Sequence, residues 1–156
     1  LNLQPYCVES ARAAAEDLPT TLYSLQLAYN QSFDDDCAQA FALHLPCTLR
    51  KLNVDHTGIG EEGAWAIAEH LPETLRYLSM SGCRIGGAAH RLGLALPCTL
   101  RTLNLDNCAL GVKGAQDIGP NLPPSLRHLS LSNNEFGEEG VRAIASRLST
   151  FCKKLV

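Results

Sequence analysis

One short motif recurs along the chain and determines what it can fold into. The pattern Leu-Pro-x-Thr/Ser-Leu occurs five times. Its final leucines lie 27, 26, 25 and 26 residues apart, and they are Leu22, Leu49, Leu75, Leu100 and Leu126. A fixed period of this length is typical of a solenoid, in which each repeat is one supersecondary unit that must stack on its neighbours to bury a core.

Each of these leucines begins a strand pattern, L-x-x-L-x-L. Leu78, Leu103 and Leu129 hold its central apolar position and are expected to be core residues. One column lies three residues past the last apolar position of each repeat. Apart from a tyrosine in the first repeat, its side chains are Asn, Thr or Cys, which can hydrogen-bond a buried turn. We expect these side chains to stack as a hydrogen-bonded ladder, in which the two cysteines are structural rather than reactive. The ladder column consists of Tyr6, Asn30, Thr57, Cys83, Cys108 and Asn134.

The second half of each repeat has apolar residues at helical spacing. Ala64, Ile67, Ala68 and Leu71 form one such stripe, and a proline follows it and ends the helix. Strands joined through helices run parallel, and because helices are wider than the spacing between strands, the array should curve with its strands on the concave side. The pattern predicts helices over residues 9–18, 35–44, 61–70, 87–95, 113–121 and 138–148.

Glycine motifs connect the strands to the helices, as in Ile59-Gly60-Glu61-Glu62-Gly63 and Phe136-Gly137-Glu138-Glu139-Gly140. Together with the strand signal and the Ala/Leu helices, they resemble the ribonuclease-inhibitor-like class of leucine-rich repeats over essentially the whole chain. The resemblance implies an α/β fold, a curved right-handed solenoid with a parallel sheet on the concave side and helices on the convex side. Residues 1–156 would form a single horseshoe segment of about six repeats of 24–27 residues, open at both ends and a fragment of a longer array or protein.

Composition and charge exclude several classes of function. The net charge is −3 and the pI about 5.9, whereas a dedicated nucleic-acid-binding protein is usually basic. No apolar run approaches the length of a membrane span. The seven cysteines are odd in number and include no C-x-x-C pair, which argues against a zinc module and a complete disulfide framework. Free thiols indicate a reducing compartment, the cytoplasm or the nucleus.

We find no catalytic, cofactor or metal motif in a fitting context. Residues 58–63, Gly-Ile-Gly-Glu-Glu-Gly, have the form G-x-G-x-x-G, but two carboxylates stand where a pyrophosphate would bind, and the repeat itself explains Gly60 and Gly63. The run Asp34-Asp35-Asp36 lacks the alternating ligands of a calcium loop and is better interpreted as a charged helix start. The sequence therefore predicts a protein that is not an enzyme and needs no cofactor or metal.

The residues expected on the concave face are the best candidates for partner binding. Strand alternation turns the third position of L-x-x-L-x-L outward, and the turn after the strand adds further exposed positions. Aromatic side chains surrounded by polar groups carry most interface energy. The candidate concave-face residues are Tyr29, Lys51, Asp55, His56, Tyr77, Asp106 and His128.

Two further features compete with this face. One rim column is nearly uniform and consists of Tyr23, Arg50, Arg76, Arg101 and Arg127. We interpret its arginines as structural, bonding the carbonyls of the turn below, and the alternative is a strip for an acidic partner segment. Trp65 occupies an otherwise polar helical column and is expected to be exposed on the convex side, where it either covers a neighbouring helix or marks a second site.

Two functions from different classes fit these features. The first is a non-catalytic protein–protein interaction or scaffold module, which binds a protein partner through the concave face and contacts flanking repeats or domains of the same protein or assembly. The alternative is a regulator of an enzyme, either an inhibitor or a GTPase activator of the ribonuclease-inhibitor or Ran GTPase-activating type. Neither function involves a nucleic acid or a membrane.

Overall fold

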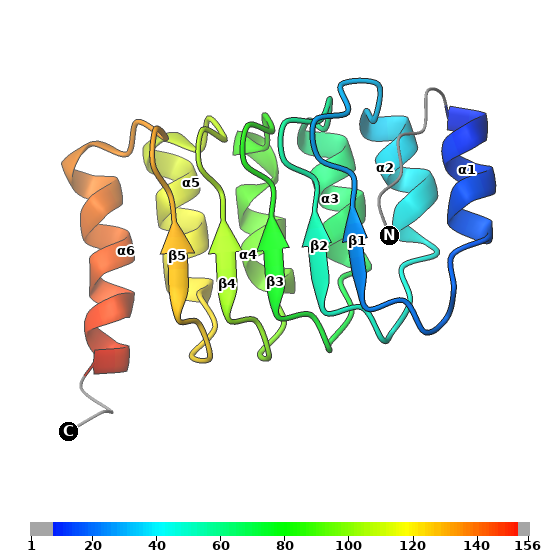
Figure 1. Cartoon of the computed structure of the whole chain (residues 1–156). Helices are drawn as coiled ribbons and strands as arrows, with labels where there is room; N and C mark the ends of the chain where they lie inside the picture. The colour runs from blue at the N-terminus through cyan, green and yellow to red at the C-terminus, as the bar shows by residue number, and fades with distance from the viewer. Residues whose placement is uncertain (1–7, 153–156) are drawn as a thin grey trace.

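The computed structural model describes residues 8–152, which form two layers (Figure 1). Three-residue strands make one layer and helices the other, in strict alternation along the chain. The strands are β1 (Ser24–Gln26), β2 (Lys51–Asn53), β3 (Tyr77–Ser79), β4 (Thr102–Asn104) and β5 (His128–Ser130). The helices are α1 (Val8–Glu16), α2 (Asp35–Ala42), α3 (Glu61–Glu69), α4 (Ala89–Ala95), α5 (Gly111–Ile118) and α6 (Gly137–Cys152), with 3₁₀ turns at Gly86–Ala88 and Gly119–Asn121.

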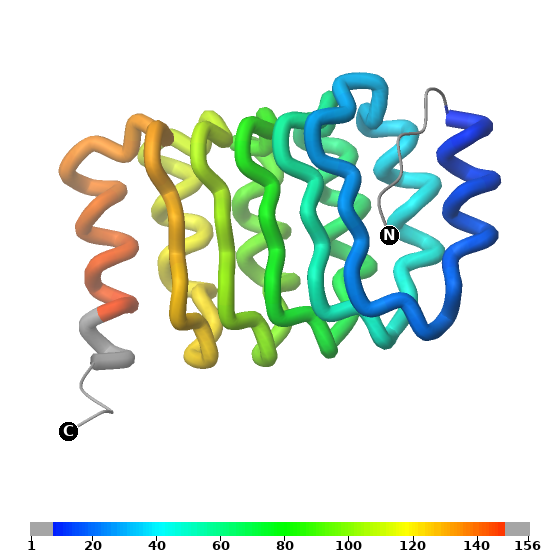
Figure 2. The backbone as a smooth tube through the Cα atoms, in the orientation of Figure 1, coloured from blue at the N-terminus to red at the C-terminus, as the bar shows by residue number. Residues whose placement is uncertain are grey.

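The five strands form one parallel sheet in the order β1-β2-β3-β4-β5. Every pair is in register, so that Leu52 lies beside Leu78 and Leu78 beside Leu103. The backbone winds from strand to helix and back once per repeat (Figure 2). The predicted α/β solenoid is therefore confirmed, with its sheet on the concave side and its helices on the convex side.

The leucines of the strand pattern fill the space between the two layers. Leu25, Leu52, Leu78 and Leu103 are almost completely buried. Leu129 is only partly buried, and the expectation that it lies at the centre of the core is wrong. It belongs to β5, an edge strand of the described sheet, so that β4 covers it from one side only.

The predicted ladder of polar side chains is present beneath the turns that follow the strands. Asn30, Thr57 and Asn134 are buried, as are both cysteines of the column, whereas Tyr6 lies outside the described residues. Three members bond a carbonyl oxygen of the preceding repeat, which ties each turn to its neighbour. These bonds run from Cys83 Sγ to Val54 O (3.2 Å), from Cys108 Sγ to Met80 O (3.1 Å) and from Asn134 Nδ2 to Leu105 O (2.7 Å).

The acidic run at residues 34–36 starts a helix, as predicted. Asp34 is the N-cap of α2, and its Oδ1 accepts a hydrogen bond from the Cys37 amide (3.1 Å). Asp35 caps the next helix instead, because its Oδ1 accepts from the amides of Gly60 (2.6 Å) and Gly63 (3.0 Å) at the start of α3. A carboxylate of the chain thus occupies the helix N-terminus that a dinucleotide would need.

Five cysteines are free thiols, and they lie in two environments. Cys47 and Cys98 are exposed in the Leu-Pro turns, while Cys37, Cys83 and Cys108 are buried. Burial raises the pKa of Cys83, and it raises the pKa of Cys108 to about 12. The ladder cysteines are therefore protonated near neutral pH, consistent with the structural role predicted for them.

We predict that Leu78→Ala lowers the free energy of unfolding by about 2–5 kcal/mol, because it opens a cavity in a fully buried layer. Thr102→Ala, on the outward side of the adjacent strand, should cost well under half as much. Urea unfolding followed by circular dichroism measures both changes. Equal losses would mean that the strands face the opposite way.

We also predict that iodoacetamide at pH 8 modifies Cys47 and Cys98 first, because only exposed thiolates react rapidly. Cys83 and Cys108 should react only after unfolding, since burial and their raised pKa values suppress the thiolate. Peptide mass spectrometry over a time course distinguishes the two groups. All seven thiols should titrate under denaturing, non-reducing conditions, and a lower count would reveal a disulfide.

Candidate functional site

The candidate residues of the concave face fall into two rows, one at each end of the strands. Lys51, Tyr77 and His128 are the first residues of β2, β3 and β5. The register places Lys51 beside Tyr77, and Thr102 between Tyr77 and His128. These residues are at least partly exposed, so their side chains form one continuous row where the strands begin.

The second row lies in the turns after the strands, where an exposed Tyr29 and a half-buried His56 form an aromatic pair. Their rings stack with centroids 5.1 Å apart and planes 18° apart. Tyr29 is 76% exposed, so one face of the pair is open to solvent.

The backbone holds this aromatic pair in an unusual conformation. Tyr29 (φ 61°) and His56 (φ 52°) occupy the left-handed region, which favours glycine and asparagine. The turn ladder imposes it, because the Tyr29 amide donates to Asp55 O (2.7 Å) and the His56 amide to Ser81 O (2.7 Å). In the next repeat Gly82 takes this position, and a Cβ there would collide with the His56 ring. The hydrogen bonds between turns therefore fix the backbone of both residues, and the glycine in the next repeat leaves space for the His56 ring.

The two candidate aspartates are engaged inside the solenoid. Asp55 Oδ1 accepts hydrogen bonds from Ser79 Oγ (2.6 Å) and from the Ser81 amide (2.7 Å) of the next repeat. Asp106 accepts in the same way from Ser130 Oγ and from the Ser132 amide (2.6 Å). The sequence carried a signal for this role, since aspartate and serine alternate in this column from Asp55 onward.

The arginine column does not form the hydrogen bonds to the carbonyls of the turn below that were predicted for it. Within residues 8–152, the side chains of Arg76, Arg101 and Arg127 make no hydrogen bond and no ion pair. Threonine and serine of the Leu-Pro-x-Thr/Ser-Leu motif bond the carbonyls of the turn below instead. The bonds to the strand-starting leucine carbonyls are Thr48 to Leu22 (2.9 Å), Thr74 to Leu49 (2.8 Å), Thr99 to Leu75 (2.8 Å) and Ser125 to Leu100 (2.6 Å).

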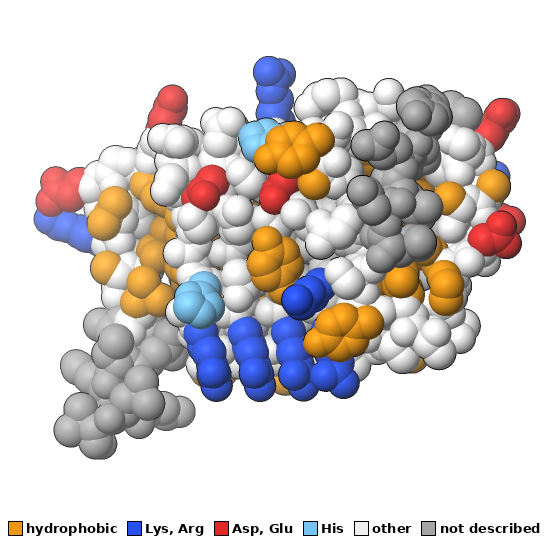
Figure 3. Space-filling model, in the orientation of Figure 1, with side chains coloured by type: hydrophobic (Ala, Val, Ile, Leu, Met, Phe, Trp, Pro, Cys, Tyr) orange, Lys and Arg blue, Asp and Glu red, His pale blue; other side chains and the backbone are white. Residues whose placement is uncertain are grey.

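Charge is distributed unevenly between the two layers. Across the part of the chain that the structure describes, the ion pairs are His90–Asp117, Lys113–Asp117 and Arg142–Glu138, all among α4, α5 and α6. The sheet face has none, and its basic side chains stand in a row along the lower edge in Figure 3. The Arg50 guanidinium carbon lies 5.3 Å from the centre of the Tyr23 ring, which extends this edge with an aromatic group that we did not predict as a site residue.

Trp65 is half-buried, so the expectation that it is exposed is wrong. The guanidinium carbon of Arg91 lies 3.5 Å from the centre of its ring and covers it from α4. The other described members of its column, such as Gln116 and Arg142, are exposed. Trp65 thus packs against a neighbouring helix, which was one of its two interpretations.

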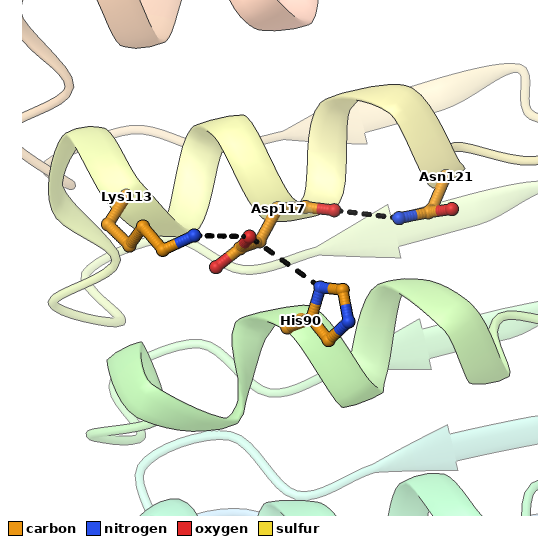
Figure 4. Close-up of polar contacts among 4 residues, drawn as sticks. All are labelled: His90, Lys113, Asp117 and Asn121. Carbon is orange, nitrogen blue, oxygen red and sulfur yellow. Dashed lines mark hydrogen bonds and ion pairs between the residues drawn. The ribbon is translucent and has the colours of Figure 1, made fainter.

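A polar cluster that sequence reasoning missed joins α4 to α5 on the convex side (Figure 4). Asp117 accepts a hydrogen bond from Lys113 Nζ (2.9 Å), and its carboxylate lies 3.6 Å from His90 Nδ1. The Asn121 amide group donates to the Asp117 carbonyl oxygen (2.8 Å). The i, i+4 spacing of Lys113 and Asp117 is the signal that could have found half of this cluster.

The sequence matches the model of a known family over four stretches. The family is described as leucine-rich repeat, and the matches cover residues 46–68, 72–89, 97–119 and 123–145. The chain belongs to the leucine-rich repeat family. Leucine-rich repeat arrays commonly use their concave surface to bind other proteins.

A solved structure supports the same fold. The leucine-rich repeat chain is similar to the tropomodulin C-terminal domain from a structural genomics programme on Caenorhabditis elegans, with a TM-score of 0.67 and 15% sequence identity. The match covers 95% of each chain. A search of curated proteins found no match to the sequence.

Over residues 8–152, no three His, Cys, Asp or Glu side chains are grouped so that they could hold a metal ion. No helix in that range has the length and apolar character needed to cross a membrane.

We predict that Asp106→Ala lowers the free energy of unfolding by about 1–2 kcal/mol, because Ser130 and the Ser132 amide lose a charged acceptor. Asp106→Asn should recover part of this loss, since its amide oxygen still accepts. Glu69→Ala, an exposed acid at the end of α3, is the control and should change stability by under about 0.5 kcal/mol. Chemical denaturation measures all three, and an Asp106→Ala effect no larger than the control would contradict the anchoring role.

Proposed function

We propose that this leucine-rich repeat domain is a non-catalytic protein-interaction or scaffold module that binds its partner through the concave face. The stacked pair of Tyr29 and His56 is the observation that carries the proposal. It presents aromatic surface to solvent, and hydrogen bonds between turns hold it in place. Little conformational entropy remains to be lost on binding, so such a pair suits an interface anchor.

The row at the strand starts supplies a second part of the interface. Tyr77 stands between Lys51 and Thr102, with His128 one strand further along. An aromatic ring among polar and basic groups has the composition of a hot spot. In this proposal Asp55 and Asp106 act indirectly, by fixing the turns that follow β3 and β5.

A reducing compartment, the cytoplasm or the nucleus, is part of the proposal. Cys47 and Cys98 are free and exposed, and such thiols persist best where disulfides do not form. Flanking repeats or domains of the same protein or assembly are proposed as additional partners at the two ends of the solenoid.

The proposal is tested by placing a photo-crosslinking amino acid at Tyr77 and, separately, at Gln116 on the convex side. Both variants are irradiated in extract from the native source, and the adducts are identified by mass spectrometry. We expect one protein to be trapped from position 77 and not from position 116. Adding Tyr29→Ala to the position-77 variant should reduce capture of that protein. Crosslinking of the same protein from position 116 alone would contradict a concave site.

A further inference from the structure

The arginine row differs from the other repeated columns of the solenoid because its side chains form no hydrogen bond and no ion pair within residues 8–152. Arg50 contacts the Tyr23 ring, with its guanidinium carbon 5.3 Å from the ring centre. The leucine columns fill the core, and the Thr/Ser column bonds the carbonyls of the turn below. The Asn/Thr/Cys column bonds the turns at the opposite edge. Among the described residues, the side chains of Arg76, Arg101 and Arg127 make no hydrogen bond or ion pair, although their position is arginine in four of five repeats.

Backbone hydrogen bonds align this row. The amide of Arg76 donates to Arg50 O (2.9 Å), that of Arg101 to Arg76 O (2.9 Å) and that of Arg127 to Arg101 O (2.8 Å). Consecutive arginines therefore stand at equivalent positions, each one residue before a strand, about 4.8 Å apart. The three steps from Arg50 to Arg127 span about 14 Å. Arg76, Arg101 and Arg127 are exposed and Arg50 is half-buried.

The row concentrates positive charge on a protein whose net charge is −3. Lys51 and His128 stand directly beside Arg50 and Arg127 in the sequence and begin strands of the same sheet. The acid closest in sequence is Glu73, in the turn before β3, and it forms no ion pair with any described arginine. Guanidinium groups in such a row repel one another, and carboxylates from outside would remove that repulsion.

We propose that the arginine row, Arg50, Arg76, Arg101 and Arg127, is a docking site for an acidic α-helix of a partner protein that lies across the strands. Glutamates at i, i+3, i+7 and i+10 form one helical stripe with a mean step of about 5 Å and a total length of about 15 Å. These values match the strand spacing and the row length. An extended segment presents side chains on one face about 6.7 Å apart and falls out of step with the arginines. The inference rests on the proposed concave-face function and names the chemistry of the partner.

A protein segment fits this surface better than a nucleic acid does. In its centre the row is one residue deep, because the uncharged side chains of Tyr77 and Thr102 follow Arg76 and Arg101, and the same face carries Asp55 and Asp106 near its other edge. A duplex would bring phosphates toward these carboxylates. A single helix can contact the arginine edge alone.

The test is fluorescence anisotropy with the full chain and a labelled alanine-rich peptide of about 20 residues, long enough to form a helix in solution. Its glutamates occupy the i, i+3, i+7, i+10 stripe. Arg76→Gln/Arg101→Gln should weaken binding about tenfold at low salt, since two charge-assisted contacts are lost. Arg12→Gln/Arg84→Gln, which removes the same charge from exposed sites outside the row, should change Kd less than about twofold.

Two further probes make the proposal specific. A peptide of the same composition with its glutamates spread around the helix should bind at least about fivefold more weakly, because only the stripe aligns with the arginines. A single-stranded DNA oligonucleotide of equal charge should also bind more weakly. Circular dichroism confirms that all protein variants are folded.

Several results would overturn the proposal. Equal losses in the two double variants would show attraction by general charge, and tighter binding of the oligonucleotide would favour a nucleic acid. Equal binding of both peptides would show that the arginines do not recognise the spacing of glutamates along one side of the helix. None of these results affects the concave-face function, which the crosslink from position 77 tests. If that crosslink succeeds while the peptide fails to bind, only the acidic-helix inference is wrong.

Discussion

The whole solenoid depends on hydrogen bonds between neighbouring repeats, because no strand is long enough to stand alone. Each strand has three residues. Both ends of β3, β4 and β5 are tied to the preceding repeat by side chains. Thr74 Oγ1 bonds Leu49 O where β3 begins, and Cys83 Sγ bonds Val54 O after β3 ends. These side chains satisfy carbonyls that a short strand would otherwise leave buried and unpaired. The strand spacing is therefore fixed at both edges.

This constraint separates the residues that build the fold from those that remain available to a partner. Asp55 is a polar residue on the concave face, yet its carboxylate is committed to Ser79 and Ser81. His56, the next residue, has its backbone bonded into the same turn while its ring stacks on Tyr29 in the open. Adjacent residues of one turn thus serve the scaffold and the surface, and only the bonding pattern tells them apart.

The structural features that recur in every repeat could be predicted from the sequence. The helices, the in-register leucines and the Asn/Thr/Cys ladder all follow from a period of 25–27 residues, because each copy supplies the same contact. Features that depend on one particular neighbour could not be predicted. The column alignment pairs Trp65 with His90, but Arg91 covers the indole and His90 lies near Asp117 instead. That repeat is one residue short and enters its helix through a 3₁₀ turn, which shifts the contact. The arginines recur with the repeat, but their recurrence alone did not reveal what their side chains contact.

The two edges of the sheet face have different chemistry, and this difference restricts how a partner can lie on it. The arginine row and the Tyr29–His56 pair are separated by six residues along the chain, from Arg50 to His56, or at most roughly 20 Å. A net charge of −3 gives no long-range attraction for an acidic partner, and salt screens the row beyond about 8 Å. In the proposed complex the arginines would therefore act after contact, where they would select the register of the partner rather than its rate of approach. A partner that reaches both edges must place acidic groups at the strand starts and an apolar or aromatic group beside Tyr29, and it can satisfy both in only one orientation.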